Sequence, residues 1–176
     1  VAMWYYPKTI FNYLIMSLED VSTSSTWSNV TNGVSNATSD FKGELNQTNI
    51  LTQALHTTSA AKLCDDYAGG GFTDWYLPSV FEMNHAFNAG SIVGTVLGSD
   101  LLTHQYWTST EISATTAYFY SFEEALYAVP IPYIGYQKSD VKSSTKKVRA
   151  FRLATNAVEA NIWDTTWDEG YTPWWG

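Results

Sequence analysis

The sequence predicts an α+β domain with several short strands, two helices and long loops. Short aromatic and β-branched runs follow one another from Tyr106 onward, separated by Ser, Thr and Pro, which is typical of short strands. Residues 49–67 and the stretch just past Pro78 instead carry apolar residues at helical spacing. Residues 19–49 are polar and rich in turn residues, which indicates a long loop before the first helix.

Size and composition favour one extracellular domain with a real core. The chain has 176 residues, which is enough for one such domain. Charged residues make up only 15% and aromatic residues 16%, a balance that suits an extracellular β-rich or loop-rich domain. The formal net charge of −8 argues against nucleic acid as a partner, because phosphate binding needs a basic surface. No stretch looks like a membrane span or a signal peptide.

The first apolar run is expected to form a buried strand. Residues 1–18 are apolar and aromatic and are interrupted by Pro7, and the run 11–18 has the pattern of a buried strand. In the polar segment that follows, Asn32–Gly33 marks the clearest turn, and Trp27 is an isolated apolar anchor.

The helical region over 49–67 is expected to end at a glycine run. Ser59 can cap its second part, after which four apolar residues from Ala60 to Tyr67 recur on one helix face. Gly69–Gly71 then follows the helix. A glycine loop that cradles phosphate opens a helix and is joined by Lys or Arg, so this run is interpreted as a helix stop.

The second helix has a clearer start signal. It follows Pro78, and Ser79 with Glu82 forms the S-x-x-E capping box. His85 has no partner at ligand spacing, which indicates a surface or packed histidine and not a metal ligand. Cys64 is the single cysteine, so neither an intrachain disulfide nor a cysteine zinc site is possible, and its apolar neighbours indicate a buried structural thiol.

Four sequence blocks carry a family resemblance. They are LIMSLEDVSTSSTWSNV (14–30), AAKLCDDYAGGGFTDWYLPSVFEMN (60–84), YWTSTE (106–111) and KKVRAFR (146–152). In order and spacing they resemble the C-terminal domain family of bacterial collagen-like adhesins, which also recurs in phage tail-fibre tips and marine bacterial surface proteins. The chain departs from the family at its start, where VAMWYYPKTIFNY stands in place of a glycine-rich strand.

The resemblance implies a C-type-lectin-like fold with a small twisted antiparallel sheet, two helices and long loops on one face. The variable proteins of diversity-generating retroelements share this fold. The resemblance also implies an extracellular adhesion or receptor-binding domain for glycans or surface polymers. Such a domain is displayed on a bacterial cell surface or a virion, often as a trimer at the end of a fibre. We therefore expect a recognition domain over 1–152 and an acidic, Trp-rich extension over 153–176.

Three motif residues have expected structural roles. Trp75 and Trp107 are large apolar groups with one donor each, and their motif positions predict core tryptophans. Glu111 closes the YWTSTE block, where its carboxylate could accept hydrogen bonds from loop N–H groups or pair with Arg149 or Arg152.

The segment between YWTSTE and KKVRAFR is the expected ligand-binding surface, since the family varies most there. Exposed tyrosines are rigid and amphipathic, and they stack on sugar rings. The alternative is that alternate tyrosines are ordinary core residues of strands. Residues 118–145 are also a candidate for diversification by a retroelement. The candidate ligand-binding residues are Tyr118, Tyr120, Tyr127, Tyr133, Tyr136 and Lys138.

No enzymatic activity, cofactor or metal is expected. The adjacent acids Asp65–Asp66 and Glu123–Glu124 are typical of solvated surface, and no nucleophile motif is present. The rival hypothesis is a structural component of a virion or filament, in which the extension docks onto neighbouring subunits. The candidate docking residues are Trp163, Trp167, Trp174 and Trp175.

Overall fold

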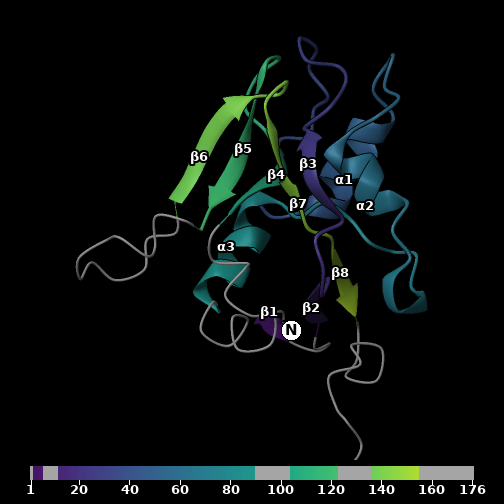
Figure 1. Ribbon diagram of the computed structural model, residues 1–176, viewed down its shortest axis with the longest axis vertical. Coiled ribbons are helices and arrows are strands. Elements are labelled where there is room, and N and C mark those ends of the chain that lie inside the picture. Colours follow the sequence, from purple (N-terminus) through teal and green to yellow (C-terminus); the bar gives the residue numbers. More distant parts are fainter. Residues whose placement is uncertain (1, 6–11, 90–103, 123–135, 155–176) are drawn as a thin grey trace, which may run out of the picture.

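The computed structural model describes residues 2–5, 12–89, 104–122 and 136–154, and these form a mixed α+β arrangement (Figure 1), as predicted. The strands are β1 (Ala2–Tyr5), β2 (Asn12–Met16), β3 (Ser22–Thr26), β4 (Gln105–Glu111), β5 (Thr116–Ser121), β6 (Tyr136–Val141), β7 (Thr145–Val148) and β8 (Phe151–Ala154). The helices are α1 (Gly43–Leu51), α2 (Ala60–Asp65), the 3₁₀ turn η1 (Gly69–Gly71) and α3 (Val80–Asn88).

The strands form two sheets. One has three strands in the order β1-β2-β8, and the other has five in the order β3-β7-β4-β5-β6. Neighbouring described strands are antiparallel, apart from β4 and β7, which run parallel. Figure 1 shows β8 beside β2, so the last described strand returns to the beginning of the chain. The strand expected over 11–18 is confirmed as β2.

Helices pack on both faces of the five-stranded sheet. Tyr106 of β4 and Tyr120 of β5 are opposed, and they share a buried cluster with Phe87 of α3. Trp107 is the next residue along β4 and therefore projects from the other face. There it shares a cluster with residues of α1 and α2, including Cys64. The sheet thus lies between α3 and the α1–α2 pair.

The tryptophans of the motif blocks lie in the core, as predicted. Trp27, Trp75 and Trp107 belong to one buried cluster together with Cys64. The Trp27 indole donates to the Thr108 carbonyl at 2.8 Å, and the Trp107 indole donates to a β3 carbonyl at 2.9 Å. The buried thiol is also confirmed, and burial raises the pKa of Cys64. Residues far apart in the sequence are therefore tied together by both packing and hydrogen bonds.

The helical region predicted over 49–67 is two helices in the structure. Between α1 and α2, Leu55 has a φ of 67°, in the left-handed region, which a continuous right-handed helix does not allow. Ser59 caps α2 as predicted, by accepting a hydrogen bond from the Lys62 amide at 2.9 Å. Since α2 ends at Asp65, Tyr67 lies beyond the helix and not on its apolar face.

Glu82 joins the starts of two helices. The predicted capping box with Ser79 is present, and the same carboxylate accepts a hydrogen bond from the Gly43 amide at 3.1 Å and one from the Tyr76 hydroxyl at 2.9 Å. A Cβ at Gly43 would lie 2.6 Å from that carboxylate, so this position requires glycine. Burial raises the pKa of Glu82, while its hydrogen bonds oppose the shift.

Candidate functional site

The segment predicted as the binding surface is described only in part. Tyr118 and Tyr120 lie on β5, and Tyr136 and Lys138 lie on β6. The other predicted ligand-binding and docking residues lie outside the described residues, and these are Tyr127, Tyr133, Trp163, Trp167, Trp174 and Trp175.

The pairing of β5 with β6 separates two described members of that surface. Tyr118 lies opposite Ser139, whereas Lys138 lies opposite Phe119. Directly opposed residues share a face of the sheet, and successive residues of a strand alternate between faces. Tyr118 and Lys138 therefore project from opposite faces, and they do not form one contact surface.

Tyr120 is a core residue and not an exposed stacking group. Its side chain is 1% exposed, and its ring packs against Phe87 and Phe122. The hydroxyl donates to the Asn84 side chain of α3 at 2.9 Å. Burial raises the pKa of Tyr120 to about 12. The alternative interpretation, that strand tyrosines are ordinary core residues, is therefore correct for Tyr120.

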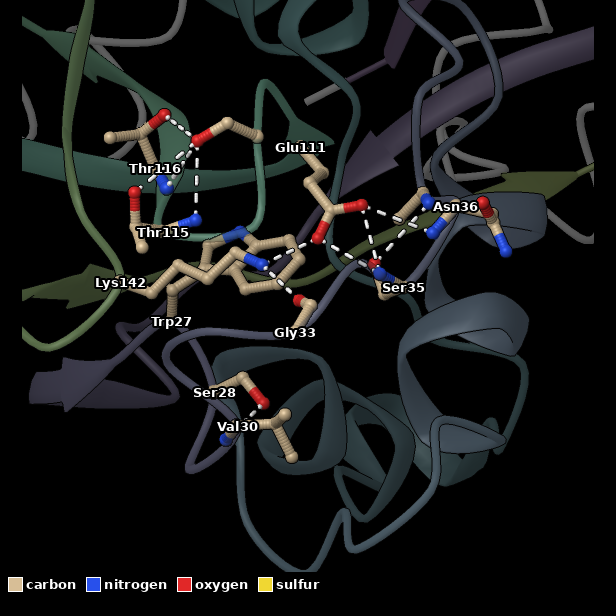
Figure 2. Close-up of polar contacts among 12 residues, drawn as sticks. Trp27, Ser28, Val30, Gly33, Ser35, Asn36, Glu111, Thr115, Thr116 and Lys142 are labelled. Carbon is tan, nitrogen blue, oxygen red and sulfur yellow. Dashed lines mark hydrogen bonds and ion pairs between the residues drawn. The ribbon is translucent and has the colours of Figure 1, made fainter.

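Glu111, at the end of β4, holds the loop formed by residues 33–36. Its carboxylate accepts hydrogen bonds from the amides of Ser35 at 2.9 Å and Asn36 at 3.0 Å (Figure 2). Asn36 has a φ of 64°, a conformation that asparagine tolerates better than most residues. The predicted role of Glu111 as an acceptor for loop N–H groups is confirmed.

Lys142 supplies the charge partner of Glu111. Figure 2 shows its ammonium between the Glu111 carboxylate and the Gly33 carbonyl, to which it donates at 2.8 Å. The ammonium also lies 4.8 Å from the centroid of a Trp27 ring. The Lys142 side chain is 0% exposed and that of Glu111 is 1% exposed. This Glu111–Lys142 pair is sealed from solvent, and it fixes a loop without offering a surface to a ligand.

The two arginines of the VRAFR block pair elsewhere, so the prediction that one of them pairs with Glu111 is wrong. Arg149 donates from Nε to Asp20 at 2.9 Å, and Arg152 donates from Nε and Nη2 to the two oxygens of Asp74, both at 2.8 Å. Lys147 of β7 pairs with Tyr106, near the first residue of β4, and both arginines come shortly after Lys147 in the sequence. Glu111 is the last residue of β4 and therefore lies at the other end of that strand.

Arg152 lines a cleft of about 500 Å³ beside the η1 turn. Aromatic rings, aliphatic side chains of the β2 end and the turn after it, and two charged groups form its walls. We call it the aromatic cleft. Its principal side chains are Tyr67, Phe72, Trp75, Ile15, Leu18, Glu19 and Arg152.

The glycine run shapes one wall of the aromatic cleft. Gly70 and Gly71 have φ values of 66° and 81°, which let the chain turn sharply after α2. A Cβ at Gly69 would lie 2.3 Å from the Tyr67 ring, so glycine there makes room for this ring. The Trp75 indole donates to the Gly69 carbonyl at 3.1 Å. The run is thus a helix stop, as predicted, and also a support for two aromatic side chains.

The aromatic side chains of the cleft hold one another in place. The Tyr67 and Trp75 rings meet edge to face with their centroids 5.2 Å apart, a favourable geometry. The Arg152 guanidinium lies 3.7 Å from the Phe72 ring centroid. Trp75 is only 6% exposed, whereas Tyr67 and Phe72 are half-buried. The ring surface that a ligand can reach therefore belongs mainly to Tyr67 and Phe72.

Burial and charged neighbours shift the pKa of Tyr67 in the cleft and of Asp74, the partner of Arg152. The Tyr67 hydroxyl donates to Glu19 at 3.4 Å, and the pKa of Tyr67 is raised by burial and, secondly, by Glu19. The hydrogen bonds from Arg152 lower the pKa of Asp74. The cleft thus combines half-buried rings with an exposed carboxylate.

The sequence carries one signal for this cleft, namely two aromatic residues on either side of the glycine run. Composition alone does not distinguish this pair from the other aromatic residues of the chain. Tyr67 and Phe72 bracket the glycine run, but Tyr67 fitted a helix face and the run fitted a helix stop. Glu19 and Arg152 lie far from the run in sequence, and the β2–β8 pairing brings them to it.

No protein-family model matches the chain, and no curated protein matches it either. Within the described ranges, no group of His, Cys, Asp and Glu side chains is placed to hold a metal ion. None of the helices described is long and apolar enough to cross a membrane.

Proposed function

We propose that this chain is a C-type-lectin-like recognition domain, displayed on a bacterial surface or a virion, that binds surface glycans or polymers. The family resemblance of the four blocks is the first support for this proposal. Those blocks meet in one core, since Trp27, Trp75 and Trp107 share a cluster and Tyr76 pairs with Phe151 of β8. This packing supports the treatment of the four blocks as parts of one domain.

The observation that carries the proposal is the aromatic cleft. Carbohydrate ligands present apolar ring faces and many hydroxyls, so they favour rigid aromatic side chains next to polar groups. Tyr67 and Phe72 provide such rings, and contacts with Trp75 and Arg152 fix their positions before a ligand arrives. A preorganised wall binds more tightly, because less side-chain entropy is lost on binding.

A screen of the purified chain against glycans and cell-surface polymers tests the proposal. We expect Phe72→Ala and Tyr67→Ala each to weaken binding of a hit by about tenfold or more, since aromatic stacking contributes roughly 1–3 kcal/mol per ring. Phe41→Ala is the matched control, because Phe41 is a 54% exposed phenylalanine that does not line this cleft. Circular dichroism of each variant establishes that the fold is intact.

Two outcomes would contradict the assignment. If Tyr118→Ala abolishes binding while the two cleft variants bind normally, the site lies on the β5 strand as the sequence predicted and not in the cleft. If no glycan or surface polymer is bound by the folded chain, the proposed function itself falls.

A further inference from the structure

We infer that the aromatic cleft selects an amine-bearing, positively charged sugar polymer over its neutral or acidic counterparts. This inference rests on the proposed function and names the ligand class of the same site. The inference follows from a difference between the two charges that line the cleft. The positive charge already has a partner inside the molecule, whereas the negative charge is open to a ligand.

The positive charge that lines the cleft is already engaged. Arg152 donates two hydrogen bonds to the Asp74 carboxylate, and its guanidinium lies against the Phe72 ring. Its side chain is only 5% exposed. An anionic ligand would therefore compete with Asp74 for a cation that is both paired and covered.

The negative charge that lines the cleft is open. Glu19 is exposed, and among the described residues it forms no ion pair, while its carboxylate accepts one hydrogen bond, from Tyr67 at 3.4 Å. A ligand ammonium can donate charge-assisted hydrogen bonds to this carboxylate. The same ammonium would lie near the Tyr67 ring, where a cation is also attracted by the aromatic face.

Other charges near the cleft do not reverse this balance. Behind the turn that carries Glu19, Asp20 pairs with both Arg149 and Lys147. These two cations are only 6% and 15% exposed, and Arg149 also donates to the carbonyls of residues 17 and 18. At the Tyr67 hydroxyl, the effect of Glu19 on the pKa exceeds the opposing effect of Arg149.

The end of α2 precedes Tyr67 in the sequence and lies outside the cleft lining, and its charges are also mainly negative. Lys62 contacts both Asp65 and Asp66, so that two carboxylates share one ammonium directly before Tyr67. The cleft groups that are most open to a ligand, Glu19 and the Tyr67 and Phe72 rings, are acidic and aromatic, which is the combination that recognises ammonium groups. Amino sugars carry an ammonium on a ring that can also stack, so one ligand class satisfies both features of the cleft.

Binding of glucosamine oligomers tests the inference against N-acetylglucosamine oligomers of the same length, in which a neutral acetamide replaces each ammonium. Titration calorimetry of the full chain, in a buffer where the amines are protonated, gives both affinities. We expect the amine form to bind about tenfold more tightly, as one hydrogen bond to a charged group predicts. Glu19→Gln should remove this preference, so that the ratio of the two affinities falls to about one.

A matched control separates the site from general attraction, since a chain of net charge −8 draws any polycation. Glu44→Gln removes the same charge from an exposed position on α1 that does not line the cleft, so the preference should persist. Equal losses in the two variants would overturn the inference. If both oligomers bind equally well and Phe72→Ala weakens the binding of both, the inferred ligand class is wrong. The proposed function would remain intact in that case. If neither oligomer is bound, the inference falls, and the wider glycan and surface-polymer screen decides the proposed function separately.

Discussion

Two regions of this molecule place a carboxylate, a cation and a tryptophan close together, and they differ in their access to solvent. In the Glu111–Lys142 pair, the cation lies over Trp27 and both charged side chains are almost fully buried. In the aromatic cleft, the carboxylate of Glu19 is exposed and its neighbouring rings are half-buried. The same types of side chain thus form a sealed structural contact in one region and an open surface in the other.

The comparison shows that the function of such a cluster depends on how its hydrogen-bonding capacity is used. Both oxygens of Glu111 are engaged by loop amides, and Lys142 donates to Glu111 and to a carbonyl. Nothing remains there for a ligand. Among the described residues, the Glu19 carboxylate accepts a single hydrogen bond, which is long at 3.4 Å. Buried charges that are fully paired specify structure, while a partly satisfied exposed charge can be satisfied by a ligand.

The largest expected effect comes from breaking the sealed pair. Lys142→Met should leave the Glu111 carboxylate buried without its charge partner and should destabilise the fold by about 3–5 kcal/mol. Urea unfolding followed by tryptophan fluorescence gives the free energy of unfolding of both proteins.

The double variant Lys142→Met with Glu111→Leu provides the control for that prediction. It removes both charges, so its stability should lie closer to that of the unmodified chain than the stability of Lys142→Met does. A Lys142→Met protein of unchanged stability would mean that the pair is not the contact that holds the 33–36 loop.

A glycine comparison at the aromatic cleft should give a smaller effect on stability and a clear effect on binding. Gly69→Ala places a methyl group 2.3 Å from the outer end of the Tyr67 ring, which can swing away. We expect ligand affinity to fall by about tenfold, since stacking on one ring is lost. The change in stability should stay below about 1 kcal/mol, because the ring moves and the backbone does not.

Gly71→Ala is the matched partner of that variant. A Cβ there meets no atom within 4 Å, but the residue has a φ of 81°. It should therefore lose about 1–2 kcal/mol of stability through backbone strain and keep its affinity. If both alanine variants bind equally well, the Tyr67 ring does not form part of the ligand contact.

Local signals in the sequence predicted the elements whose cause is local. The Ser79–Glu82 capping box and the Ser59 cap depend on side chains within three residues of their partners, and the structure contains both. The Ser59 cap indicated a helix start at that point, but the left-handed turn at Leu55 could not be predicted, because leucine rarely adopts that conformation.

The site was less predictable, because tertiary pairing decides it. The sequence suggested Arg149 or Arg152 as a partner for Glu111, and the structure uses Lys142, since the β4–β7 contact places the arginines at the other end of β4. Tyr120 fitted a binding surface by composition, but its strand position points it at α3. Alternation along a strand was visible in the sequence, whereas which face is covered was not.

The smallest expected effect is a pH dependence at the cleft. Hydrogen bonds from Arg152 lower the pKa of Asp74 below its ordinary value of 3.8. A carboxyl group whose pKa is lowered on folding stabilises the fold above that ordinary value, and the contribution is lost as the pH falls through the pKa of the folded state. Asp74 is 53% exposed, so solvent screening keeps this contribution below about 1 kcal/mol.

Asp74→Asn isolates this contribution when urea midpoints of both proteins are compared from about pH 6 down to about pH 2. The unmodified chain should be slightly more stable near pH 6, and the two curves should converge in acid. A difference that persists at the lowest pH would show that the substitution disturbs packing and not charge. A small difference that closes in acid would mean that the Arg152–Asp74 pair adds little stability and mainly orients the guanidinium on Phe72, unlike the sealed pair at Lys142.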